Sequence, residues 1–513
     1  MTRESGGEKP WIRADRPARA AFFGALIWGL AAQGMGLFNK FSWHDDIFQL
    51  FGTGNTITSG RWMLYVLERA ETLIFGGHCS LPLFNGFLAL VFVGATAALA
   101  TVLLRIRRPV YGALLGAAMA SFPMITSLFG FMFAAPAYLL ALLMIMASAY
   151  LICEDGRWPA RAAGIVLGAC SVGIYQAFLP VLPTMMALCD LRALADGEKR
   201  PSAVLRELAL QGLCLALIMA VYTAASRFFL WKYGLWLDTY MGIDQAATTS
   251  PLVYLQRAGR AYREFFLPSR NVSWDMYPGR AVDLYRVMLA ADALMALRLI
   301  LRAGRKDRAG AILMALLFLL IPLGCNFIFV MSEEVHGLMT FGQTLQMALF
   351  LWLTDRTELS RPGNRKLISG LAAFLMAGLG VIYFRSDNQC YLKTAFQQQE
   401  AISWNTALVA QIKSAKGYRD DLPVAWINRE NARDRTLYSM KELDFLQLNS
   451  YERDLQGYIN NWTWDVFLAR WCGFAPEMAN PEDVMTRPEV ESMPAYPADG
   501  SILVLEDVVV VKF

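Results

Sequence analysis

The sequence predicts an α-helical, polytopic membrane protein with about eleven transmembrane helices and a small C-terminal α/β domain outside the membrane. Of its 513 residues, 56% are hydrophobic and only 18% are charged, whereas soluble globular proteins carry about 25% charged residues. Apolar runs with few charges recur between residues 20 and 386. Most of them approach the roughly 20 residues that a helix needs to cross the hydrocarbon core of a bilayer.

The eleven predicted spans are 20–39, 81–104, 109–127, 134–152, 162–175, 177–190, 208–230, 282–302, 310–331, 338–354 and 367–386. The pair within 162–190 is short and turns at Tyr175-Gln176, so one long broken helix is the alternative. The loop charges favour eleven spans, because this number places every Arg/Lys cluster on one side of the membrane, as is typical of cytoplasmic loops. The N terminus is then inside and the C terminus outside.

This topology divides the chain into a cytoplasmic arm at 1–19, a membrane domain at 20–387 with outer loops 40–80 and 231–281, and an outer domain at 388–513. The outer domain begins with a helix-like stretch at 395–416, followed by a strand-like stretch at 422–427 and another helical stretch at 453–471. Its last residues alternate like a β-hairpin. Cys390 and Cys472 both lie in this domain, so a disulfide is possible.

Several functions are excluded by what the sequence lacks. The net charge is only +4 and no basic tract is present, so nucleic acid is not an expected partner. None of the eight cysteines forms a CxxC pair, which argues against zinc or iron–sulfur ligation. No Walker motif is present, which argues against an ATP-driven pump.

Asp45 and Asp46, next to His44, come directly after the first span, among aromatic and apolar residues. A solvated helix cap is the ordinary interpretation of an aspartate at such a junction. Two neighbouring carboxylates that are partly desolvated raise each other's pKa, which favours a general base. Residues 46–60 are expected to form a helix along the interface that ends at Gly60.

Four cations could bind a phosphate at this membrane surface: Arg61, Lys232, Arg257 and Arg260. Arg61 stands beside Trp62, and such a pair is often only an interfacial anchor. A planar guanidinium is also the preferred partner of phosphate oxygens. Arg257 and Arg260 lie on one face of a predicted surface helix, where anchoring to anionic headgroups is the alternative role.

A second acidic outer loop contains Glu333, Glu334 and His336, and its chemistry resembles that of the first. If the two loops converge, Asp45, Asp46 and His336 could hold a divalent cation, Mg²⁺ or Mn²⁺. A polar cap on a hairpin is the alternative. Tyr175 and Gln176 lie at a turn near the same surface, where they could line a lipid groove.

Asp292 lies in the middle of a predicted span, where an acid is by default a functional candidate. It could instead pair with Arg286 or Arg298 on neighbouring turns. A transporter or flippase should carry several ionisable groups near the midplane, and only Asp292 fits, which disfavours transport.

The His44-Asp45-Asp46 stretch, Gly60-Arg61-Trp62, Tyr175-Gln176 and the closing Val-Val-Val-Lys together resemble the type II Gtr family of membrane glucosyltransferases, which modify O-antigen in lipopolysaccharide and convert serotype. The topology is similar to that of the wider GT-C class. The resemblance implies an enzyme of the bacterial inner membrane. Its donor would be a polyprenyl-phosphate sugar, typically glucose, made by a separate enzyme.

By this resemblance, Asp45 or Asp46 would deprotonate a hydroxyl of a glycan acceptor on the periplasmic side, and transfer would proceed with inversion. Arg61 or a cation from 231–281 would steady the departing lipid phosphate. The C-terminal domain matches no catalytic motif, and we expect it to recognise the acceptor. A polysaccharide polymerase or ligase would also act outside on lipid-linked sugars. Those enzymes usually have one large outer loop, whereas here the terminal domain holds most of the outer mass.

Overall fold

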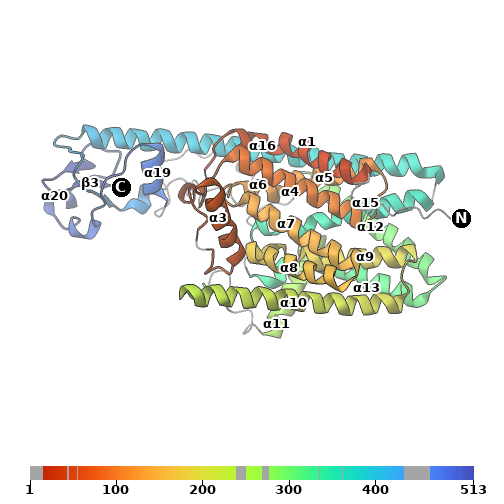
Figure 1. Ribbon diagram of the computed structural model, residues 1–513. Helices are drawn as coiled ribbons and strands as arrows, with labels where there is room; N and C mark the ends of the chain where they lie inside the picture. Colours follow the sequence, from red (N-terminus) through yellow and green to blue (C-terminus); the bar gives the residue numbers. More distant parts are fainter. Residues whose placement is uncertain are drawn as a thin grey trace.

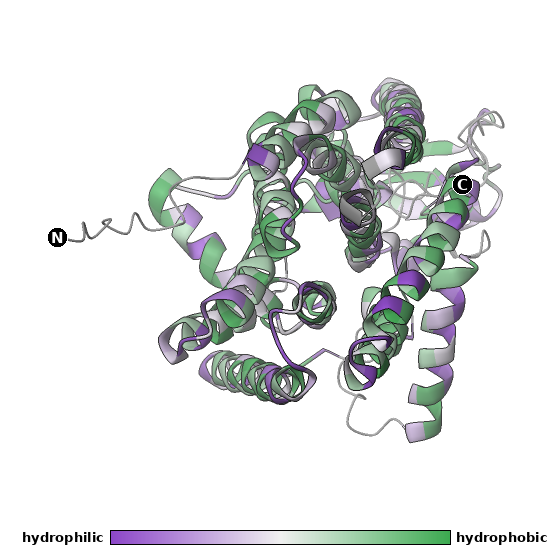
Figure 2. Ribbon diagram, turned by 90° about the vertical axis from the view of Figure 1, so that its right-hand side faces the viewer, coloured by the Kyte–Doolittle hydropathy of each residue, from purple (hydrophilic) through white to green (hydrophobic). Residues whose placement is uncertain are grey.

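A computed structural model describes residues 16–42, 45–54, 56–238, 250–268, 277–333, 335–360, 362–432 and 463–513. Most of the described residues belong to a bundle of long helices that run between two ends, with a smaller domain extending beyond one of them (Figure 1). Figure 2 looks along the bundle and shows helices packed side by side, with hydrophobic residues in most of them.

Each of the eleven predicted apolar runs overlaps a helix of the structure. These helices are α1 (Arg16–Phe38), α4 (Pro82–Leu103), α5 (Pro109–Ala120), α7 (Ala135–Tyr150), α8 (Trp158–Ile174), α9 (Val181–Asp196), α10 (Pro201–Tyr233), α12 (Ala281–Gly304), α13 (Arg308–Cys325), α15 (Thr344–Ser360) and α16 (Arg365–Ser414). Further helices lie between them: α2 (Asp45–Phe48), α3 (Trp62–Phe75), α6 (Pro123–Phe129), α11 (Pro251–Phe266) and α14 (Ile328–Met331).

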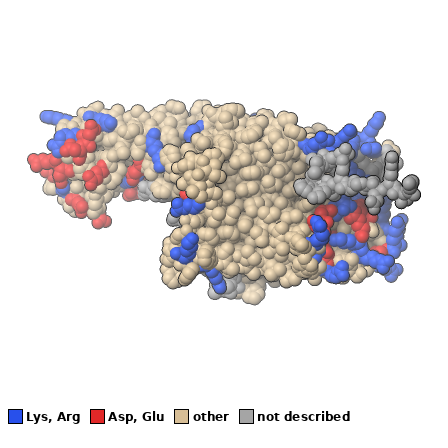
Figure 3. Space-filling view, viewed as in Figure 1, with Lys and Arg blue, Asp and Glu red and all other residues tan. Residues whose placement is uncertain are grey.

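The chain is a multi-pass membrane protein. Among its described helices, seven stretches are long and apolar enough to cross a bilayer, or eight if α5 and α6, which meet at a bend of 42°, form one broken span. Figure 3 shows the matching surface, a wide band almost free of charge between two charged ends. Eleven spans remain a prediction, because α8, at 17 residues, is among the helices too short to cross alone.

The basic loop clusters gather at one end of the bundle, which we call the basic end. Arg105 forms ion pairs with Glu154 and Glu198 there, and Arg108 Nη1 donates to Ser369 Oγ at 2.6 Å. Helix α4 runs from this end to the opposite one, and its 22 residues span about 33 Å at the rise of an α-helix. The loops after α4, α7 and α9 and the start of α16 are therefore neighbours in space.

Helices α1 and α5 pack backbone against backbone. A Cβ atom on Gly116 would lie 2.0 Å from the carbonyl oxygen of Ala21, and one on Gly112 would lie 2.2 Å from that of Pro17. The two glycines are four residues apart, the small-xxx-small spacing that allows close approach between membrane helices. Because neither position carries a side chain, the two backbones come into close van der Waals contact at both glycines.

Gly116→Ala should therefore destabilise the protein, by about 1–3 kcal/mol as in other overpacked cores. Gly34→Ala is the matched control, because a Cβ at Gly34 meets nothing within 4 Å and alanine is the better helix former. Thermal unfolding in detergent measures both. Equal melting temperatures for the two variants would contradict the close packing of α1 on α5.

Helix α16 continues from the membrane region into the C-terminal domain without a break (Figure 1). The prediction of a separate helix at 395–416 is therefore corrected, and the predicted domain boundary at 387/388 falls inside α16. The polar residues after 386 keep helical geometry because one face remains buried, for example at Tyr391, Ala401 and Leu408.

The C-terminal domain contains a three-stranded sheet of order β1-β3-β2. The predicted hairpin is confirmed, since β2 (Ile502–Val504) pairs antiparallel with β3 (Val509–Lys512). The predicted strand near 422–427 is β1 (Val424–Ile427), which pairs parallel with β3. Helix α19 (Trp464–Trp471) confirms the end of the helical stretch at 453–471, whose start lies outside the described residues. Cys390 and Cys472 are both free thiols.

Candidate functional site

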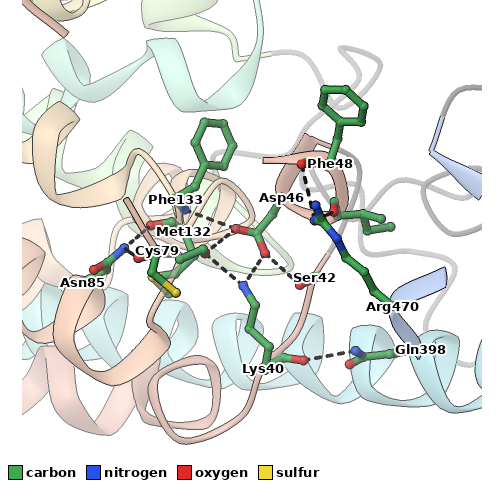
Figure 4. A network of polar contacts seen from close by, with 12 residues as sticks. Lys40, Ser42, Asp46, Phe48, Cys79, Asn85, Met132, Phe133, Gln398 and Arg470 are labelled. Atoms are coloured by element: carbon green, nitrogen blue, oxygen red, sulfur yellow. Dashed lines mark hydrogen bonds and ion pairs between the residues drawn. The ribbon is translucent and has the colours of Figure 1, made fainter. Parts of the chain in front are cut away.

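Asp46 is fully buried and joins the ends of several helices (Figure 4). Its Oδ2 accepts from Lys40 Nζ at 2.5 Å and from Ser42 Oγ at 2.8 Å. Its Oδ1 accepts from Ser80 Oγ at 2.6 Å and from the Phe133 backbone amide at 3.2 Å. These donors follow α1, precede α4 and precede α7, so one carboxylate fixes three helix ends relative to the outer loop.

The C-terminal domain also holds the loop that carries Asp46. Ile47 is fully buried in the core of that domain, together with Leu408, Trp464 and Phe467. Arg470 Nη1 donates to the carbonyl oxygen of Ile47 at 2.8 Å, at the C-terminal end of helix α2 (Figure 4). Such a contact satisfies a carbonyl that a helix end leaves unpaired.

Asp45 differs from Asp46 in its surroundings. It is the first residue of α2 and is partly exposed. Both Asp45 and Arg61 lie within electrostatic range of the Tyr138 hydroxyl. The two neighbouring aspartates thus face different environments: Asp46 is held by four donors in the protein, whereas Asp45 borders a polar site and solvent.

Arg61 lies against two stacked tyrosines. Its Nη1 donates to Tyr138 Oη at 2.9 Å, and its guanidinium lies 5.7 Å from the ring centroid of Tyr138 and 5.5 Å from that of Tyr175. The two rings stack with centroids 4.4 Å apart. A guanidinium held over aromatic faces keeps its orientation while it retains its charge.

Gln176 positions the turn before Arg61. Its Nε2 donates to the Ser59 carbonyl oxygen at 2.9 Å and lies 3.2 Å from Tyr222 Oη. Gly60, at φ +73°, completes the turn, and a Cβ there would lie 2.6 Å from Tyr222 Oη. The structure thus brings together Arg61, Tyr175 and Gln176, which the sequence nominated from segments more than a hundred residues apart.

The predicted helix over 46–60 is absent and that prediction is wrong. Helix α2 ends at Phe48, and the described residues from Gln49 to Gly60 form turns until α3 begins at Trp62. Gly54 and Gly60 both take positive φ, which interrupts a helix, and burial of Ile47 in the C-terminal domain directs the chain away from the interface. The acidic loop is therefore held by tertiary contacts.

The other predicted phosphate ligands lie elsewhere. Arg257 Nη2 lies 3.5 Å from Glu333 Oε2, and Arg260 Nη1 donates to the Glu333 carbonyl oxygen at 2.9 Å. These two cations on α11 therefore bind the second acidic loop of the same chain. Glu333 remains exposed, as expected for a polar cap.

Lys232 lies near the end of α10, with its Nζ 5.3 Å from the ring centroid of Tyr233. Tyr233 shares a 2.9 Å hydrogen bond with Tyr65, to which Arg69 Nε donates at 3.0 Å. The bonds from Tyr233 and Arg69 lower the pKa of the exposed Tyr65 hydroxyl. Tyr65 lies one helical turn after Arg61. Through Tyr65 and Tyr233, Arg69 and Lys232 form a second group of cations near Arg61.

The divalent-cation hypothesis fits these residues poorly. Within the part of the chain that the structure describes, no three His, Cys, Asp or Glu side chains form a group suited to a metal ion. Both oxygens of Asp46 already accept from protein donors, so this carboxylate has little capacity left to ligate an ion. His44 and Glu334, two of the predicted supporting residues, lie outside the described residues, and His336 caps the short turn Gly337–Met339.

Asp292 is buried and pairs with neither predicted arginine. It accepts instead from Gln346 Nε2 on α15 at 2.9 Å. A second acid, Asp387 on α16, is fully buried and accepts from Thr126 Oγ1 at 2.7 Å. Asp387 lies one residue beyond the predicted span 367–386 and was therefore not considered beside Asp292.

The residues that complete the site were not predicted: Lys40, Ser42, Ser80, the Phe133 amide, Tyr138, Tyr222 and Arg470. Lys40 is the exception that the sequence could have revealed, because it lies in the same loop as Asp46 and six residues before it. Ser42 likewise lies in this loop, four residues before Asp46, whereas the remaining residues come from distant elements and share no motif with the acidic loop.

Comparison with known proteins gives one match. Residues 34–350, more than half of the chain, match the family model described as Glucosyl transferase GtrII. The matched range begins in α1, includes both aspartates, Arg61 and Tyr175-Gln176, and ends in α15. No curated protein and no solved structure matches the chain.

Proposed function

Because the chain belongs to the glucosyl transferase GtrII family and is therefore a glycosyltransferase of the membrane, we propose that it moves a hexosyl group, glucose, from a polyprenyl-phosphate donor to a glycan acceptor. The reaction takes place at the end of the bundle that holds Asp45 and Arg61. The acceptor is a lipid-linked or surface glycan such as O-antigen, and a separate enzyme supplies the charged donor lipid.

The observation that carries this proposal is the contrast between the two aspartates. Asp46 accepts four hydrogen bonds and is closed to solvent, so it is a positioning residue. Asp45 is partly exposed and lies within electrostatic range of the Tyr138 hydroxyl, to which Arg61 donates. A general base needs access to the acceptor hydroxyl, and of the two carboxylates only Asp45 meets this requirement.

In the proposed step, the Asp45 carboxylate takes the proton of an acceptor hydroxyl as that oxygen forms a bond to the anomeric carbon of the donor. The bond from this carbon to the phosphate oxygen breaks, and its electron pair leaves with polyprenyl phosphate. Attack from the face opposite the phosphate inverts the anomeric configuration.

Arg61 stabilises the departing phosphate. Its hydrogen bond to Tyr138 and its contacts with two aromatic rings hold the guanidinium in place before the donor binds. A preorganised cation acts on charge that grows in the transition state without further reorganisation. Lys232 and Arg69 extend the positive surface outward, whereas Arg257 and Arg260 position the second acidic loop.

The proposed topology has eleven spans, an N-terminal arm inside the bacterial inner membrane, and the C-terminal domain in the periplasm beside the site. A reporter fused after Gly417, in the loop that follows α16, should then be active in the periplasm only. Cytoplasmic activity of the same fusion would contradict the eleven-span count. The domain contributes to the acceptor side of the site, because α19 contacts the acidic loop directly.

The test is sugar transfer by the purified full-length protein, given polyprenyl-phosphate glucose and a lipid-linked glycan. A panel of donor sugars and acceptors then identifies both substrates. Transfer of single glucose units supports the proposal, whereas joining of whole glycan chains would support the polymerase or ligase alternative. Family membership favours bond formation over transport, and movement of the lipid without any transfer would overturn the proposal.

Gly60→Ala should lower the transfer rate by at least about tenfold, since a small misplacement of a positioned group is costly in catalysis. The added Cβ would lie 2.6 Å from Tyr222 Oη and would displace the turn that carries Arg61. Gly76→Ala is the matched control, because Gly76 also has positive φ, +81°, but a Cβ there meets nothing within 4 Å. Similar transfer rates for both variants would show that the turn does not position Arg61.

A further inference from the structure

A cavity of about 690 Å³ opens at the basic end of the bundle, where the loops after α4, α9 and α12 meet α15. Leu194 lines it, two residues after Arg192, whose Nη1 donates to the Leu103 carbonyl oxygen at the end of α4. Asp46 contacts Ser80, just before the start of α4. The length of α4 therefore separates this cavity from the proposed catalytic site, and the site does not account for it.

The cavity is lined by an excess of cations. Its lysines and arginines include Arg107, Lys199, Arg200, Arg302, Lys306 and Arg356, against two acids, Asp196 and Asp307. The end of the molecule at which these residues lie is rich in blue side chains in Figure 3. Such a concentration of one sign of charge around a cavity attracts anions.

Both acids are already occupied within the protein. Asp196 forms an ion pair with Arg356, and Asp307 Oδ1 accepts from the Ala309 amide at 3.0 Å as the cap of α13. By contrast, the side chains of Arg107, Arg200, Arg302 and Lys306 form no ion pair with any residue that the structure describes. Four positive charges thus border the cavity without a carboxylate of their own.

Two further features match the cavity to a phosphate group carried by a lipid. The N-termini of α10 and α13 meet at its wall, where a Cβ on Gly310 would lie 3.5 Å from Pro201 Cγ, and helix N-termini favour anions. Apolar residues form the rest of the lining: Leu194, Met295, Leu299, Met314 and Leu353. Free phosphate has no apolar part to contact such a wall, whereas a lipid can place its acyl chains against it.

We propose that this cavity binds the phosphate headgroup of an anionic membrane phospholipid. Basic pockets between membrane helices on one side of the bilayer recognise such headgroups through the charges described here. The bound lipid would join α9, α10, α12 and α15 at the end opposite the acidic loop. This inference is independent of the sugar-transfer reaction, because it concerns a different end of the bundle.

The test measures binding of cardiolipin or phosphatidylglycerol to the full-length protein in detergent, by native mass spectrometry and by the rise in melting temperature. Phosphatidylcholine and inorganic phosphate are the comparison ligands. We expect the anionic lipids to bind and stabilise, and the other two to have little effect. Arg302→Gln with Lys306→Gln should weaken binding by roughly tenfold or more, as two headgroup contacts are lost.

The matched control is Arg305→Gln with Arg308→Gln, which removes the same charge from exposed residues at the same place that do not line the cavity. Equal losses in both double variants would overturn the proposal in favour of a diffuse surface charge effect. Equal stabilisation by inorganic phosphate would overturn the lipid assignment. Unchanged melting temperatures of both variants in phosphatidylcholine exclude misfolding as the cause.

Discussion

Asp45→Asn should reduce sugar transfer by about 100- to 10,000-fold, the usual contribution of a positioned general base. Its melting temperature should remain close to that of the wild type, because Asp45 is partly exposed and substitutions at such positions usually change stability by less than about 0.5 kcal/mol. The measurement is the initial rate with polyprenyl-phosphate glucose, beside thermal unfolding of the same preparation.

Asp283→Asn is the matched control for this prediction. Asp283 is an aspartate near the start of α12, exposed and paired with Arg280 at 3.0 Å, so the chemical change is the same and the site is not involved. Asp45→Glu should recover part of the activity, since it restores a carboxylate at a shifted position. A wild-type rate for Asp45→Asn would assign the base to another residue.

Asp46→Asn should chiefly destabilise the protein, by about 2–3 kcal/mol, and should lose activity only as a consequence of this destabilisation. Removing one partner of a buried ion pair costs about 3–5 kcal/mol because the other charge is left unpaired. Lys40 is 31% exposed in its side chain, so solvent relieves part of that cost. The melting temperature should fall by several degrees.

A double-mutant cycle with Lys40→Met separates this pairing from a general disturbance of the loop. Removing both charges should cost less than the two single losses added together, because neither charge is then left unpaired. Additive losses would show that Lys40 and Asp46 do not stabilise each other. Transfer by Asp46→Asn at low temperature, where the fold persists, should exceed that of Asp45→Asn.

The sequence predicted the helices well and the site in part. Apolar runs identify membrane helices because lipid allows few alternatives to a helix, and each of the eleven runs overlaps a helix. The alternating pattern at the C terminus likewise predicted β2 and β3. The helix over 46–60 failed because glycines at positive φ and the burial of Ile47 override a locally apolar pattern.

The residues of the candidate site likewise divide into those that local sequence predicts and those that only tertiary contacts bring together. Asp45, Arg61, Tyr175 and Gln176 were predicted because each has a type and a place suited to the chemistry. Ser80, the Phe133 amide and Arg470 escaped prediction because their role is set by tertiary contact alone. Asp46 was predicted as a candidate base, and its partners show in addition that this carboxylate holds the loop together.

The burial of Ile47 in the C-terminal domain bears on how such enzymes can diverge. The family match ends at residue 350, yet the acidic loop packs on side chains from Ala401 to Phe513. A sequence change in either partner alters the fit of the other, so the two must change together. Chimaeras that exchange the C-terminal domain between relatives should therefore fold when the first outer loop is exchanged together with the domain. They should not fold when the domain alone is exchanged.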